Sequence, residues 1–144
     1  MSQQNFDNHA RLDTGYHRIL FPILLLTFIG SCVNLYNSLG DHQRLYSASL
    51  ITVITMSLIA VGLYARIFAL KAQDRAIRAE ENLRHYVLTG KLLDARLTPR
   101  QIVALRFAPD SEFVELAAKA AASALDSKTI KQSIKQWKAD DYRV

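Results

Sequence analysis

Residues 19–36 read ILFPILLLTFIGSCVNLY, and residues 45–68 read LYSASLITVITMSLIAVGLYARIF. Nearly all formal charge in the 144-residue chain lies outside residues 19–36 and 45–65. A helix of about 20 mostly apolar residues rises about 30 Å, which is the thickness of the hydrocarbon core of a bilayer. The two stretches therefore predict two transmembrane helices, and they decide the fold class.

Aromatic and basic residues bracket both predicted spans. Tyr16 and Tyr36 flank the first, Tyr46 and Tyr64 lie near the ends of the second, and Arg66 closely follows Tyr64. Tyr is enriched at both membrane interfaces, and Arg can extend its charge to the interface. A buried hairpin of a soluble protein is the alternative, but the remaining polar residues are too few to cover two such helices.

The linker over residues 37–44 reads NSLGDHQR and contains residues typical of turns. An antiparallel hairpin follows, with both termini on one side of the membrane. The linker carries one basic residue, whereas the flank after the second span carries Arg66, Lys71, Arg75, Arg78 and Arg84. The positive-inside bias then predicts cytoplasmic termini. The predicted parts are a tail (1–18), a transmembrane hairpin (19–68) and a cytoplasmic stalk with a small helical unit (69–144).

Cys32 is the single cysteine, which excludes an intrachain disulfide. The tetrapeptide from Ile29 to Cys32 is similar to a bacterial lipoprotein cleavage site, where cleavage would acylate Cys32 and remove the first span. The apolar run continues past Cys32, which favours an uncleaved helix.

Small and hydroxylated residues lie at helical spacing within both spans. Such residues let helices approach closely and form hydrogen bonds across the contact. We expect helix–helix packing, within the hairpin or along an oligomer seam, at Thr27, Gly30, Ser31, Asn34, Thr52, Thr55 and Gly62. The alternative is a polar path for a solute, which would require an oligomer because two helices cannot enclose a path.

The helical pattern continues without Pro or Gly from Arg66 to Thr89, which predicts that the second span extends as a stalk capped by Gly90. Mostly small residues recur along it at alternating spacings of three and four: Ala69, Ala72, Ala76, Ala79, Leu83 and Tyr86. This seam could pair with a second copy, bind a partner, or pack on the downstream helices, and we expect the last.

Three short helices are predicted after the stalk. The first begins with a capping box from Thr98 to Gln101; Asp110 or Ser111 caps the second, and Asp126 or Ser127 caps the third, which runs to about Lys138. The third carries one basic face, either solvated or lying on an anionic membrane. The candidate membrane or partner contacts are Arg66, Lys71, Arg75, Arg78, Lys128, Lys131, Lys135 and Lys138.

Four stretches carry a resemblance: residues 4–11 (QNFDNHAR), 71–78 (KAQDRAIR), 97–108 (LTPRQIVALRFA) and 137–144 (WKADDYRV). On these the chain resembles an uncharacterised family of small bacterial two-span membrane proteins. The resemblance implies the same topology and a bacterial envelope setting. Together with the predicted cytoplasmic termini, this leads us to expect the inner membrane. It implies no activity.

Charge and motifs narrow the function classes. The net charge is +5, and the chain from residue 65 onward contains 15 Lys and Arg residues against 10 Asp and Glu residues. These charges are interspersed, which fits an anionic leaflet better than nucleic acid. No motif predicts a catalytic residue, a cofactor or a metal site. We therefore expect an all-α, membrane-anchored interaction or accessory protein without chemistry of its own, whose partners are the bilayer and either itself or other membrane-protein subunits. The alternatives are an oligomeric pore and, more distantly, a membrane-surface enzyme that holds lipid headgroups in its basic collar.

Overall fold

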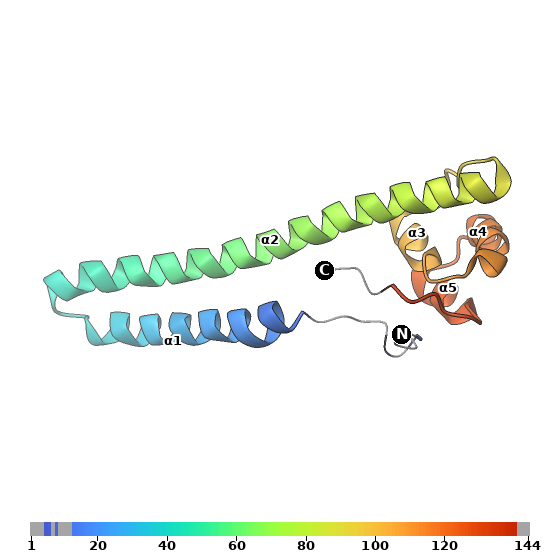
Figure 1. Ribbon diagram of the computed structural model, residues 1–144. Helices are drawn as coiled ribbons and strands as arrows, with labels where there is room; N and C mark the ends of the chain where they lie inside the picture. The colour runs from blue at the N-terminus through green and yellow to red at the C-terminus, as the bar shows by residue number, and fades with distance from the viewer. Residues whose placement is uncertain (1–4, 7, 9–12, 141–144) are drawn as a thin grey trace. The chain divides into compact units, whose positions relative to one another are not determined.

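The computed structural model describes Asn5, Phe6, Asn8 and residues 13–140. These residues form helices and no strands (Figure 1), which confirms the predicted all-helical class. The chain divides into two compact units, here called the hairpin unit (within Leu12–Ala69) and the C-terminal unit (within Leu70–Val144). Residues 1–4, 7 and 9–12 of the predicted tail and residues 141–144 lie outside the described residues, so the stretches 4–11 and 137–144 are described only in part.

The first helix of the hairpin unit begins earlier than residue 19. A π-helical segment, η1 (Gly15–Leu20), runs directly into α1 (Phe21–Asn37). The Asp13 carboxylate accepts the backbone N–H of Tyr16 at 2.7 Å, and the Asp13 carbonyl accepts the N–H of His17 at 2.9 Å. These bonds satisfy N–H groups that the start of a helix leaves unpaired. The helix can therefore begin several residues before the apolar stretch.

The turn after α1 is shorter than the predicted linker. Only residues 38–41 separate α1 from α2 (His42–Thr89), which returns antiparallel to α1 (Figure 1). Gly40 has φ 99°, a conformation that favours glycine. Oδ1 of Asp41 accepts the N–H groups of Gln43 and Arg44 at 3.1 and 3.3 Å, so α2 begins at His42, three residues before the apolar stretch that starts at Leu45.

α2 is one continuous helix of 48 residues. Its C-terminal end is as predicted: Gly90 has φ 74° and donates its N–H to the Tyr86 carbonyl at 2.7 Å. Both Gly15–Asn37 and α2 are long and apolar enough to cross a membrane, and only 6% and 11% of their most apolar windows are buried. The core helices of a soluble protein bury their apolar faces instead.

The C-terminal unit contains α3 (Pro99–Leu105), α4 (Asp110–Ser123) and α5 (Ser127–Ser133). α3 contacts both α4 and α5. Four large side chains are fully buried between these elements: Leu105, Phe107, Phe113 and Ile130. This unit therefore has a hydrophobic core of its own.

Two of the three predicted helix starts are confirmed. The Thr98 hydroxyl accepts the Gln101 N–H at 3.4 Å while Oε1 of Gln101 accepts the Thr98 N–H at 2.7 Å, and Asp126 accepts the Thr129 N–H at 2.7 Å. The predicted cap of α4 is wrong, because Pro109 is the N-cap and Asp110 is the first helical residue. Pro109 fixes its own φ, and the Asp110 side chain bonds outside its helix.

We expect Thr98→Ala to lower the free energy of unfolding of the C-terminal unit by about 1 kcal/mol, because it removes the capping oxygen. Fluorescence of Trp137, the single tryptophan, reports this unit because its ring lies 5.0 Å from that of Phe107. Denaturant titration of the detergent-solubilised chain gives the value. Ser111→Ala is the control, since Ser111 is exposed and lies within α4 without capping it; equal losses in both variants would contradict the capping role.

Candidate functional site

Hydroxyl groups meet where α1 and α2 contact each other. Ser31 and Thr55 are buried, and their hydroxyl oxygens lie 3.1 Å apart. Thr52 donates its hydroxyl to the Ser31 carbonyl at 3.2 Å, and Ala48, one turn before Thr52, is buried as well. Each hydroxyl thus reaches across the hairpin as well as to its own helix.

The other predicted packing residues are distributed differently. Gly62 lies at the contact, where its carbonyl accepts the Tyr16 hydroxyl at 2.9 Å and a Cβ would meet Leu24 at 3.9 Å. Thr27 is exposed and donates to the Ile23 carbonyl of its own helix at 2.8 Å. Gly30 and Asn34 are exposed as well. An oligomer seam at Thr27, Gly30 and Asn34 stays a prediction.

Arg66 lies beside the first turn of the hairpin unit. Its guanidinium carbon is 5.9 Å from the centre of the Tyr16 ring, and the same Tyr16 binds the Gly62 carbonyl. The aromatic ring and the basic side chain expected at one membrane interface are therefore next to each other, although they come from opposite ends of the hairpin sequence.

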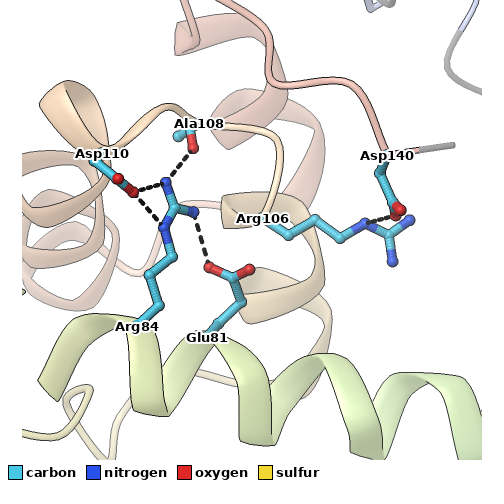
Figure 2. Close-up of polar contacts among 6 residues, drawn as sticks. All are labelled: Glu81, Arg84, Arg106, Ala108, Asp110 and Asp140. Carbon is cyan, nitrogen blue, oxygen red and sulfur yellow. Dashed lines mark hydrogen bonds and ion pairs between the residues drawn. The ribbon is translucent and has the colours of Figure 1, made fainter. Parts of the chain in front are cut away.

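A polar cluster, largely buried at Arg84 and Glu81 but exposed at Asp110, joins α2 to α4 inside the C-terminal unit (Figure 2). Arg84 donates from Nη1 to Glu81 at 3.0 Å, from Nε to Asp110 at 2.7 Å and from Nη2 to the Ala108 carbonyl at 2.8 Å. The side chains of Arg84 and Glu81 are only 13% and 9% exposed. The Arg84 guanidinium also lies 4.2 Å from the centre of the Phe113 ring. The sequence gives no local signal for this cluster, because Asp110 lies 26 positions after Arg84 and its place before α4 predicts a helix cap.

A second ion pair ties the end of the described chain to α3. Nε of Arg106 lies 3.1 Å from Asp140, and the guanidinium is 4.6 Å from the Phe107 ring (Figure 2). Both this pair and the Arg84 cluster hold the small helices together, so the structure gives them a packing role.

The predicted packing of the small-residue seam on the downstream helices is wrong. Ala69 is partly buried and lies in the hairpin unit, whereas the other members are all exposed: Ala72, Ala76, Ala79, Leu83 and Tyr86. The face of α2 that is buried in the C-terminal unit carries Ile77 and Glu81 instead. The reason is the Arg84 cluster, which turns the neighbouring face of the helix toward α4 and leaves the seam on the outside.

The predicted basic helix is shorter than expected. α5 ends at Ser133, so Lys128 and Lys131 are helical whereas Lys135 and Lys138 lie beyond it. Glu112 accepts the N–H groups of Lys135 and Gln136 at 2.9 and 3.0 Å, and the Phe107 carbonyl accepts that of Lys138 at 2.8 Å. These bonds take the place of the hydrogen bonds that a longer α5 would form. The four lysines therefore do not lie on one helix face. Lys71, Arg75 and Arg78 are exposed on α2.

One carboxyl group on the loop after α2 has a strongly shifted pKa. Arg96 donates from Nε and Nη2 to the two oxygens of Asp94 at 3.0 and 2.7 Å, and from its backbone N–H at 2.9 Å. The side-chain bonds first, then the backbone bond, lower the pKa of Asp94 from 3.8 to about 2. The pKa of Asp126 is lowered as well, by its bonds to Thr129.

We expect Arg96→Ala to return the pKa of Asp94 toward its ordinary value, as measured by NMR titration of the side-chain carboxyl. Because the pKa is depressed in the folded state, the stabilisation by this pair is fully present above about pH 4 and is lost as the pH falls through about 2. Asp126 is the internal control, and its pKa should not respond. An unchanged Asp94 pKa in the variant would rule out Arg96 as the cause.

Among the described residues no group of three His, Cys, Asp or Glu side chains is arranged to hold a metal ion. Comparison with known proteins gives one match: the model of a family described as "Family of unknown function (DUF6526)" matches residues 1–144. No curated protein and no solved structure matches the chain.

Proposed function

The chain belongs to this family of unknown function, and we propose that it is a membrane-anchored interaction protein without chemistry of its own. The two long helices anchor it in a bilayer. The membrane is the inner membrane of a bacterium. The C-terminal unit, which includes most of the second half of α2, presents a helical docking surface on the cytoplasmic side.

The exposed side chains of the hairpin unit support the anchoring. Large apolar residues on both helices are about half exposed or more, among them Ile19, Leu26, Ile29, Val33, Ile51, Val53, Ile54, Met56 and Val61. A soluble monomer rarely exposes a continuous apolar surface of this extent, whereas lipid tails would cover it. The hydroxyls of Ser31, Thr52 and Thr55 are bonded within the hairpin, as a membrane interior requires.

One observation carries the docking role. Leu83, Tyr86 and Val87 are 64%, 54% and 75% exposed on α2, and none of them belongs to the hydrophobic core of the C-terminal unit. An exposed apolar surface that does not contribute to its own core is typical of a protein interaction site.

Thiol labelling tests the anchoring. In a Cys32→Ala background, Leu39→Cys places a thiol in the turn between α1 and α2, and Ala122→Cys places one on exposed α4. We expect a membrane-impermeant maleimide to label Leu39→Cys in intact cells and Ala122→Cys only after lysis. Labelling of both variants in intact cells, or of both only after lysis, would contradict a hairpin with cytoplasmic termini.

The native mass tests the interaction role. After extraction in mild detergent, we expect an assembly larger than one chain, with components that mass spectrometry identifies. A single chain on its own would contradict the proposal. Turnover of a lipid by the purified protein, abolished by Asp74→Asn or Arg78→Gln, would replace it with an enzymatic function.

The alternative is an oligomeric pore, and the exposure of Thr27 and Asn34 on α1 favours it. Two polar side chains on an otherwise apolar surface could line a path between several copies. Solute flux in liposomes that is lost on Asn34→Leu, but retained in the exposed control Cys32→Leu, would support the pore over the interaction protein.

A further inference from the structure

The exposed face of α2 in the C-terminal unit has a regular pattern. We call Ala72, Ala76, Ala79, Leu83 and Tyr86 the apolar seam; all are exposed, and Val87 beside them is 75% exposed. Ile77 and Glu81, on the neighbouring face, are the residues that this unit buries. The seam therefore belongs to a surface that the described residues leave uncovered.

The spacing of the seam matches a coiled coil. Its members follow one another at four, three, four and three residues, which places Ala76 and Leu83 at a positions and Ala72, Ala79 and Tyr86 at d positions of a heptad. A strict repeat of seven keeps one face turned toward a partner helix that has the same repeat. Small side chains at most of these positions allow the two helix backbones to approach closely.

Charges beside the seam identify the partner. In the same heptad Arg75 is a g residue and Glu80 is the e residue five positions later. In a parallel pair of identical helices in register, the g residue of each chain lies next to this e residue of the other chain. The dimer would therefore contain two symmetric ion pairs between Arg75 of one chain and Glu80 of the other. An antiparallel pair centred on Ala79 would instead bring the two Glu80 side chains together.

Arg84 does not compete for Glu80 in the folded chain. It is the basic residue one turn after Glu80, but its guanidinium is bound by Glu81, Asp110 and the Ala108 carbonyl. Arg75 and Glu80 are both exposed beside the seam. The charge pattern is therefore available to a second chain.

We infer that the docking surface binds a second copy of this chain, as a parallel coiled coil of two α2 helices through the apolar seam. The inference rests on the proposed membrane anchoring, because two chains inserted with the same topology present α2 in the same direction. It names the partner of the proposed docking surface.

Cysteine cross-linking in the native membrane tests the pairing. In the Cys32→Ala background, Ala72→Cys and Ala79→Cys are oxidised with copper phenanthroline, and Asp74→Cys, an exposed position away from the seam, is the control. We expect disulfide-linked dimers at both seam positions, with a yield about tenfold above that of the control, because a disulfide requires closely approaching Cβ atoms. In an antiparallel pair, identical residues of the two chains lie close together only near the two-fold axis that relates the helices. Linkage at one seam position alone would therefore overturn the parallel register.

Charge reversal tests the partner contact. Measured by the yield at Ala79→Cys, we expect Arg75→Glu and Glu80→Arg each to weaken association about tenfold, since each turns two attractive pairs into two repulsive ones. The double reversal, Arg75→Glu with Glu80→Arg, should restore the yield. Arg78→Glu, the same charge change away from the seam, should leave it unchanged. Equal yields in all four variants would overturn the role of Arg75 and Glu80.

The two proposals fail separately. Absence of seam cross-links in a chain that still purifies within a larger assembly would overturn the homodimer and leave the interaction function in place. Absence of cross-links together with a single-chain native mass would overturn both.

Discussion

Arg84→Leu is expected to lower the free energy of unfolding of the C-terminal unit by about 3–5 kcal/mol. The change leaves the Glu81 carboxylate, whose side chain is 9% exposed, without the guanidinium that it binds at 3.0 Å. It also removes the donor to the carbonyl of Ala108, a fully buried residue. An unpaired buried charge costs more than the net contribution of the pair, so the loss is large.

Trp137 fluorescence during denaturant titration measures this loss. The matched control is Arg78→Leu, the same substitution at an exposed position of the same helix, which should change stability by less than about 0.5 kcal/mol. The double variant Glu81→Leu with Arg84→Leu should recover part of the loss, because no buried carboxylate then lacks a partner. A double variant that is less stable than Arg84→Leu would contradict this account.

Phe113→Ala is expected to destabilise the same unit by about 3–5 kcal/mol, through lost burial and the cavity that remains. Phe113 is fully buried, and its ring contacts the Arg84 guanidinium at 4.2 Å and the His85 ring at 6.0 Å. The substitution therefore removes core volume and also the aromatic surface on which the Arg84 cluster rests.

Two further variants separate these effects. Phe113→Leu keeps most of the side-chain volume but loses the ring contacts. Apart from those contacts, it should lower the free energy of unfolding by less than about 1.5 kcal/mol. Leu92→Ala, at a side chain that is 67% exposed, should be close to neutral. Because Arg84 and Phe113 touch, the losses of Phe113→Ala and Arg84→Leu should not add in the double variant. Full additivity would show that the ring and the guanidinium are independent.

Local features of the sequence determined the helices and three of their ends. Two apolar stretches of sufficient length specified two long helices, and the residues of the turns and caps acted over three or four positions. Gly90 at the end of α2, the Thr98 capping box and Asp126 before α5 are each formed by neighbours in the chain, so their residue types were enough to predict them.

Tertiary structure decided which faces are covered and where the last helix ends. Glu112 accepts the N–H groups of two residues after α5, across 23 and 24 positions, and so the lysine face that a continuous helix would have carried does not form. Arg84 forms an ion pair with Asp110 rather than with Glu80. This pairing directs the face of α2 that carries Ile77 toward the core of the unit and leaves the apolar seam exposed. The physical reason is that helix formation depends on hydrogen bonds within one turn, whereas the choice between two amphipathic faces depends on partners that only the folded chain brings together.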